Sequence, residues 1–194
     1  MTAEERILAA LEQLDVQTDA SVVAKLTALW RSFGNLRDAD AEKLLPRAER
    51  IIHAGQRTIA RGTAASQRRL IAALGLPGIA SPLDLDALLL RLGDTGARAA
   101  VVTVYGELAD GAKYPVARER GLRTLLDIAS DAMVRTRIQA SAQVLATSGA
   151  RGYRRVLTAA DTCARCRAAA ENIYTRADLK PVHNRCRCGV APVA

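Results

Sequence analysis

Apolar residues recur every three or four positions over most of the first 148 residues, which is the period of an amphipathic helix. Thr2 and Glu5 have the spacing of a capping box and predict a helix start. Asp19 or Ser21 is expected to cap a second helix, which Gly34 ends. The apolar faces of the two helices are predicted to hold Ile7, Leu8, Leu11 and Leu14, and then Val22, Val23, Leu26, Leu29, Trp30 and Phe33.

Four further helices are predicted before residue 148. The first begins at Asp38 or Asp40 and can run on to Leu74, with Pro46 near its start, where a proline is tolerated. The segment GLPGIASPLDL, residues 75–85, breaks the pattern. A short helix over 84–92, a helix over 97–108 and a long amphipathic helix over about 116–147 follow, although VVTVY in the second of these also has the composition of a strand.

The helical period ends at SGARGYRRVL, where YRRVL alternates in the manner of a short strand. This change predicts a helical body over residues 1–148 and a small C-terminal module over residues 149–194. Aromatic residues are only 3% of the chain, which favours packed helices over a large sheet. The predicted fold class is therefore mainly α, a multi-helix body with a C-terminal module that contains short strands.

Positive charge is concentrated at the C-terminal end. Residues 151–194 hold nine Lys/Arg and three Asp/Glu, so they carry +6 of the net +8. Such a tail predicts an acidic or polyanionic partner, although a well-solvated surface has the same composition. The chain starts without the pattern of a secretory signal and has no run of eighteen apolar residues, so we expect no membrane partner and a reducing cytoplasm.

All four cysteines lie in this tail, in the order Cys163-x2-Cys166, sixteen residues, His183-x2-Cys186-x-Cys188. Two cysteines two residues apart can present both sulfurs to one ion, and a second such cluster completes the tetrahedron that Zn2+ prefers. The five donors exceed the four that a closed site needs, so the spacing leaves open which four bind. Unligated thiols, two disulfides and a redox CxxC pair are the alternatives, of which disulfides conflict with a reducing compartment.

We expect the zinc to be structural, because protein donors fill every position. A module of this length has too small an apolar core to fold alone, and a structural Zn2+ can contribute on the order of 10–16 kcal/mol to its folding.

Arginines beside the ligands are candidates for contact with phosphates or with acidic protein surfaces, unless they only solubilise the module. They are Arg151, Arg154, Arg155, Arg165, Arg167, Arg185 and Arg187.

The segments GYRRVLTAADTCARC and LKPVHNRCRCGV resemble the C-terminal module of phage Mu F-like minor head proteins, above all those of actinobacterial phages. The resemblance covers residues 151–194 well and residues 95–150 more weakly. It implies a minor capsid protein of the virion, associated with the portal or the capsid interior and made in the host cytoplasm. Portal or capsid protein would be its partner, with packaged DNA as a further, non-specific one. The matching positions are Gly152, Arg155, Val156, Cys163, Cys166, Pro181, His183, Cys186 and Cys188.

Proteins of this family are often labelled capsid maturation proteases, which gives the alternative function. With His183 assigned to zinc, His53 is the remaining candidate base, and Ser66, Ser81 or Ser141 would have to act as the nucleophile without a supporting motif. A structural and interaction protein of the virion is therefore the preferred prediction over an enzyme. A zinc-stabilised, non-specific DNA-binding protein of a host is the third interpretation. The usual zinc-finger spacing C-x2-C…H-x3-5-H is missing, so sequence-specific DNA recognition is not expected.

Overall fold

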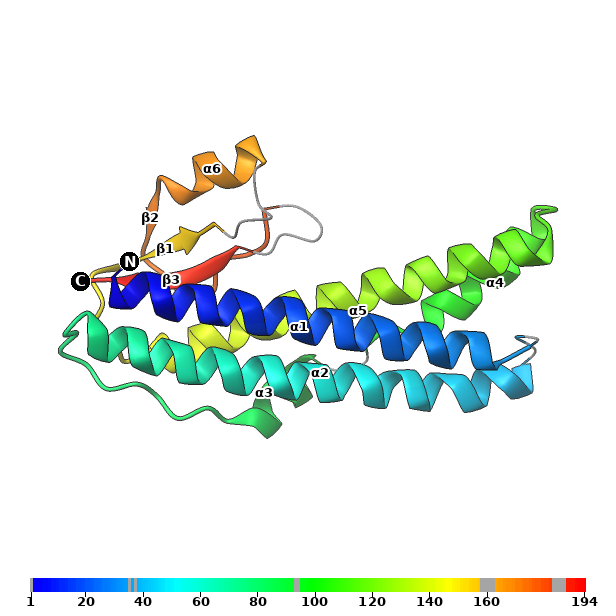
Figure 1. Ribbon diagram of the computed structural model, residues 1–194, viewed down its shortest axis with the longest axis horizontal. Coiled ribbons are helices and arrows are strands. Elements are labelled where there is room, and N and C mark those ends of the chain that lie inside the picture. The colour runs from blue at the N-terminus through cyan, green and yellow to red at the C-terminus, as the bar shows by residue number, and fades with distance from the viewer. Residues whose placement is uncertain (1, 35, 37, 93–94, 158–162, 183–187) are drawn as a thin grey trace.

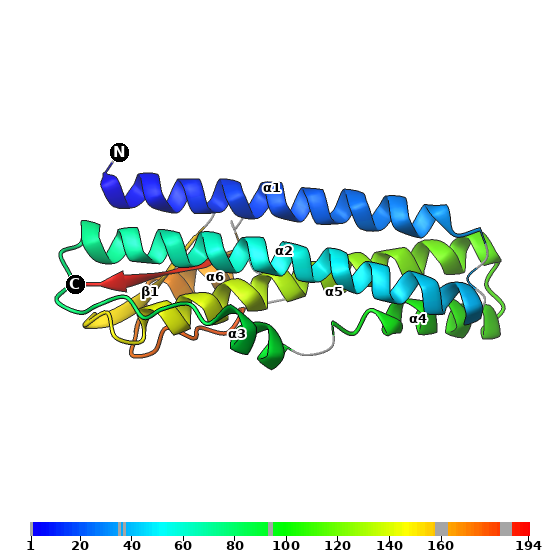
Figure 2. The same ribbon diagram turned by 90° about the horizontal axis from the view of Figure 1, so that it is seen from below.

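The structure is a computed structural model that describes residues 2–34, 36, 38–92, 95–157, 163–182 and 188–194. Three long helices run along the molecule: α1 (Ala3–Ser32), α2 (Asp38–Ala73) and α5 (Tyr114–Leu145). The shorter helices α3 (Leu85–Leu92) and α4 (Arg98–Ala109) pack against α5 (Figures 1 and 2). The prediction of a mainly helical fold is confirmed.

The N-terminal half of the body differs from the prediction, because α1 is one helix of 30 residues and not two. The predicted capping box is present, since the Glu5 amide donates to Thr2 Oγ1 at 3.1 Å and the Thr2 amide donates to Glu5 Oε2 at 2.7 Å. No glycine or proline interrupts residues 3–32. The helix therefore continues through Asp19 and Ser21, which were predicted to cap a second helix.

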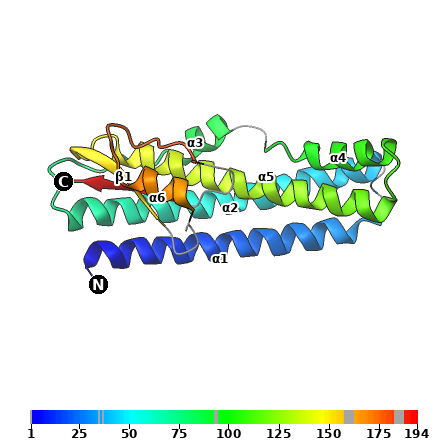
Figure 3. The same ribbon diagram turned by 90° about the horizontal axis from the view of Figure 1, so that it is seen from above.

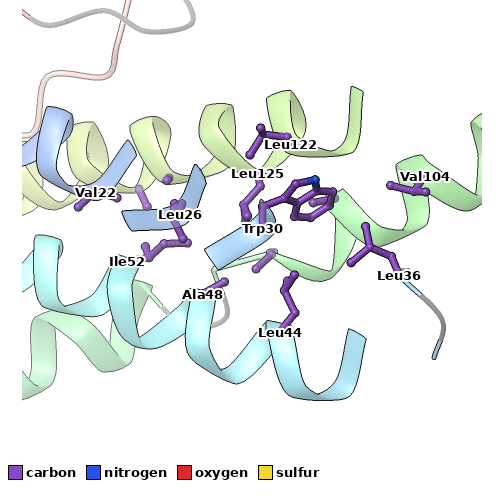
Figure 4. Packing of buried hydrophobic residues seen from close by; sticks show 14 of the residues in the cluster. Val22, Leu26, Trp30, Leu36, Leu44, Ala48, Ile52, Val104, Leu122 and Leu125 are labelled. Carbon is purple, nitrogen blue, oxygen red and sulfur yellow. The ribbon is translucent and has the colours of Figure 1, made fainter. Parts of the chain in front are cut away.

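The main core lies between α1, α2, α4 and α5 and is built mostly from Leu, Ile, Val and Ala. Trp30 is 1% exposed, and Figure 4 shows its ring among Leu36, Leu44 and Leu125, so its prediction as a core residue is confirmed. Arg118 of α5 closes the end of α1, because its Nη2 donates to the carbonyl oxygens of Trp30, at 2.9 Å, and of Phe33, at 2.6 Å. A cation at this end also suits the helix dipole.

The predicted boundaries of the other helices agree closely with the structure. The helix predicted from Asp38 is α2, in which Pro46 lies eight residues after the start and not in the first turn. The breaker over residues 75–85 separates α2 from α3, and the Ala87 amide donates to Asp84 Oδ1 at 2.9 Å. The segment VVTVY lies in α4 and is helical. In the described residues, no helix has the length and apolar composition to cross a membrane.

The C-terminal segment forms a three-stranded antiparallel sheet in the order β2-β1-β3. Strand β1 (Gly152–Val156) contains the predicted YRRV strand and pairs with β2 (Ile173–Tyr174) and β3 (Gly189–Val193). Helix α6 (Ala164–Ala170) connects β1 to β2 along the chain. The sheet lies beside the bundle at the end where both chain termini are found (Figures 1 and 3).

The sheet and the bundle share a hydrophobic cluster. Ile71 of α2 and Leu145 of α5 pack with Ala177, Leu179 and Val190 of the C-terminal segment. Each Å2 of apolar surface that is buried contributes roughly 25 cal/mol to stability. The shared cluster therefore favours packing of the C-terminal segment against α2 and α5.

Candidate metal centre

The first cysteine pair is held at the start of α6. Cys163 is the N-cap residue in an extended conformation, and its Sγ accepts a hydrogen bond from the Cys166 amide at 3.3 Å. The side chain of Cys163 thus takes the place of the usual oxygen at a helix N-cap. Such N–H to sulfur contacts stabilise the thiolate relative to the thiol, and the thiolate is the form that binds a metal.

Three of the four cysteines come together. Cys166 and Cys188 are 0% and 3% exposed, and they form one small cluster with the half-buried Cys163 and Val182. The other two predicted donors, His183 and Cys186, lie outside the described residues. Within the described residues, no three Cys, His, Asp or Glu side chains are placed to hold an ion.

Cys188 is positioned by contacts with the helical bundle. It directly precedes β3, and its carbonyl oxygen accepts from Arg137 Nη2 of α5 at 3.1 Å. Two residues later, the Val190 carbonyl accepts from Gln67 Nε2 of α2 at 2.7 Å, in a fully buried contact. Polar side chains from two helices therefore hold the backbone at Cys188 and at Val190.

Arg137 joins three parts of the molecule at this point. Its guanidinium, 5% exposed, forms an ion pair with Asp15 of α1 in addition to its bond with the Cys188 carbonyl. A buried guanidinium is tolerated only when paired and hydrogen bonded. Arg137 belongs to no sequence motif, and its one signal in the sequence is its position as a charged residue within the apolar stripe of Met133, Ala140 and Val144.

The predicted contact arginines fall into two groups. Arg151, Arg165 and Arg167 are exposed. Arg154 forms an ion pair with Glu4 of α1, and Arg155 is 8% exposed. Arg185 and Arg187 lie outside the described residues.

Arg155 is engaged inside the C-terminal segment. Its guanidinium donates to the Lys180 carbonyl and lies over the ring of Tyr174, 5.7 Å from the centroid. This is the distance range of a cation–π contact. The geometry assigns Arg155 to holding β1, β2 and the following segment together.

A bidentate surface pair lies in the same segment. Arg176 Nε and Nη2 donate to Asp178 Oδ1 at 2.8 Å and Oδ2 at 2.6 Å. The hydrogen bond from Arg176 holds the pKa of Asp178 below its ordinary value. Because Arg176 is exposed and Asp178 is only half-buried, solvent screens the pair and it adds little to stability.

The candidate catalytic residues are not brought together. Ser66 follows His53 on the same helix by 13 residues, a rise of about 20 Å. Ser141 is buried and accepts from Gln67 Nε2 at 3.2 Å, and Gln67 is one residue further along α2. Ser81 bonds to Thr147 after the end of α5. None of these three serines thus has His53 within the hydrogen-bond reach that a nucleophile and its base require.

Comparison of this chain with protein-family models, with curated proteins and with solved structures gives no match.

Proposed function

We propose that this chain is a bacteriophage minor head protein, associated with the portal or the capsid interior, whose C-terminal segment is stabilised by one structural Zn2+. The packing of the half-buried Cys163 with the buried Cys166 and Cys188 in one cluster carries the zinc part of this proposal. His183 and Cys186 stand in the sequence between Val182 and Cys188, which are both members of that cluster.

The donor set fits a structural zinc ion. Cys163 and Cys166 supply the first pair of sulfurs, and His183, Cys186 and Cys188 supply the second half of the site. Sulfur and imidazole donors with no open position bind Zn2+ as a fold-stabilising ion. The Cys166 amide at Cys163 Sγ and the Arg137 guanidinium at the Cys188 carbonyl orient the chain around such an ion.

The head assignment rests on the resemblance over residues 151–194 to Mu F-like minor head proteins. The exposed Arg151, Arg165 and Arg167 would contact the portal, the capsid or packaged DNA. Arginine suits these partners because its planar fork binds carboxylates and phosphates in a bidentate manner.

Capture of partners from the same phage genome tests the head assignment. The tagged chain is co-expressed with the portal and major capsid proteins, and we expect one of them to co-purify with it. Replacement of Arg151, Arg165 and Arg167 by Gln should weaken the capture. The control replaces the exposed Arg98, Arg123 and Arg135 of α4 and α5, which removes the same charge elsewhere. If neither partner is captured and purified heads lack the chain, the assignment is wrong.

A further inference from the structure

Most of helix α2, from residue 43 to residue 69, carries as much net positive charge as residues 151–194. Residues 43–69 contain seven Lys/Arg and one carboxylate, Glu49, so they carry +6 within 27 residues. The remainder of the first 150 residues, with twelve Lys/Arg and sixteen Asp/Glu, carries −4. The near-neutral total charge of the helical body therefore conceals one strongly basic segment, residues 43–69 of α2.

Six of these cations lie on one face of α2. Their spacing of three, four or seven residues repeats the helical period, which places them in a single stripe. The stripe spans 26 residues, and its first and last members are about 37 Å apart along the helix at the rise of 1.5 Å per residue. We call this set the α2 basic stripe; its members are Lys43, Arg47, Arg50, Arg57, Arg61 and Arg68, and all are exposed.

The stripe is available to a partner. None of its members forms an ion pair within the described chain, whereas Arg120, Arg137, Arg154 and Arg176 do. The buried face of the same helix packs into the core through Leu44, Ile52 and Ile59. Figure 2 shows α2 running along the molecule on the side that faces the viewer.

A groove beside the stripe continues the same charge. It lies between α1 and α2, has a volume of about 560 Å3, and includes Lys25, Arg47 and Arg50 but no acidic residue in its lining. Its apolar residues, among them Leu29 and Ile51, lie next to the first half of the stripe only. Arg61 and Arg68 lie beyond the groove.

We propose that the α2 basic stripe binds the phosphate backbone of duplex nucleic acid. Protein–protein interfaces have an apolar, often aromatic centre that is depleted in charge. The exposed residues between the cations of the stripe are instead small and not aromatic: Pro46, Ala54, Thr58 and Ala65. A straight row of one lysine and five arginines, about as long as one turn of B-DNA and without an apolar centre, suits a regular array of phosphates.

This inference stands without the zinc ion and without the head assignment, because it concerns another face of the molecule. If about five phosphates are contacted, the logarithm of the affinity should fall with the logarithm of the salt concentration at a slope of about −4 to −5. Binding should not depend on sequence, because phosphates carry no base information.

The test is a titration of the full chain on random-sequence duplex DNA about 30 base pairs long, roughly three helical turns. The stripe variant carries Arg57→Gln, Arg61→Gln and Arg68→Gln, all beyond the core and outside the groove lining. We expect it to bind about tenfold to a hundredfold more weakly at about 50 mM salt, with a slope shallower by about 3. The matched control, Arg98→Gln with Arg123→Gln and Arg135→Gln, should change both values much less.

Three outcomes overturn the inference. The first is undetectable binding by the unchanged chain at about 50 mM salt, where phosphate attraction is strong. The second is equal loss in the stripe and control variants, which indicates only the effect of net charge. The third is displacement of DNA by poly-glutamate at equal charge concentration, which indicates an acidic protein partner.

A further variant separates this inference from the proposed function. If replacement of Arg151, Arg165 and Arg167 by Gln abolishes DNA binding while the stripe variant retains it, the tail is the DNA-contacting surface. That result contradicts the role of α2 but leaves the proposed function intact. Zinc content is measured on every variant, and none of the replaced residues is a candidate ligand.

Discussion

At the scale of single residues, Arg137 connects the helical bundle to the cysteine cluster. We expect Arg137→Ala to lower the free energy of unfolding by about 3–5 kcal/mol, because it leaves the carboxylate of Asp15 in a buried setting and removes the donor to the Cys188 carbonyl. Denaturant unfolding followed by circular dichroism measures this loss.

The control for Arg137 is its neighbour Arg135, which is exposed on the same helix. Arg135→Ala should change stability by less than about 0.5 kcal/mol, as surface substitutions usually do. Equal effects of the two substitutions would contradict the account of Arg137 as a connection between bundle and tail.

Single residues also show where sequence reasoning was sufficient and where it was not. Trp30 lies in an apolar stripe, and burial follows directly from that pattern. Arg155 has the same sequence context as Arg154, but Arg155 is buried under contacts with Lys180 and Tyr174, which come from distant positions. Only tertiary structure distinguishes a surface arginine from one that holds a fold together.

At the scale of elements, the close approach of α4 and α5 depends on Gly121. A Cβ at this position would lie 2.4 Å from Val104 Cγ2 and 2.8 Å from the Ala100 carbonyl oxygen. Since a backbone atom cannot move aside easily, we expect Gly121→Ala to destabilise the protein by about 1–3 kcal/mol. The measurement is the shift in the denaturant midpoint.

Gly106 of α4 provides the matched substitution, because a Cβ there would meet nothing within 4 Å. Gly106→Ala should stabilise the protein by about 0.5–1 kcal/mol through its higher helix propensity. Destabilisation by both substitutions would show that the packing of α4 on α5 is described wrongly.

Helices α2 and α5 could be predicted from the sequence because a long apolar period specifies both the element and its buried face. The continuity of α1 could not, since a polar segment such as DVQTDA is compatible with either a helix or a break. In the structure the segment is helical, and it is held by the pairing of Asp15 with Arg137 on α5 and by the burial of Thr18. The residues of the segment itself give no sign of either contact. Strands β2 and β3 are short and gain stability mainly from neighbours, so their pairing could not be predicted either.

At the scale of the whole molecule, the arrangement of His53 and the serines bears on the alternative function. We expect co-expression with a candidate capsid protein to give no cleavage that depends on His53, because none of Ser66, Ser81 and Ser141 lies within its reach. The readout is the mass of the capsid protein with the unchanged chain and with His53→Ala. Specific processing that His53→Ala abolishes would make the protease the better assignment.

Charge also has a different distribution in space than along the sequence. The numbers of charged residues predict a basic surface on the tail. In the structure, however, Arg154 pairs with Glu4, and Arg155 contacts Lys180 and Tyr174. A row of cations that form no ion pair with any described residue lies instead on α2, in a body whose total charge is nearly balanced. A charged face of a helix can be recognised in a sequence only when the helical period is combined with the sign of each residue's charge.

The most direct test of the central claim is the metal content of the full chain, purified under reducing conditions. Native mass spectrometry with elemental analysis should find one Zn2+ per chain, because the three clustered cysteines with His183 and Cys186 supply more than four donors. Removal of the ion by a chelator, or Cys166→Ser, should lower the free energy of unfolding, since binding a structural zinc is coupled to folding. A folded chain without metal, of the same stability before and after chelation, would contradict the account.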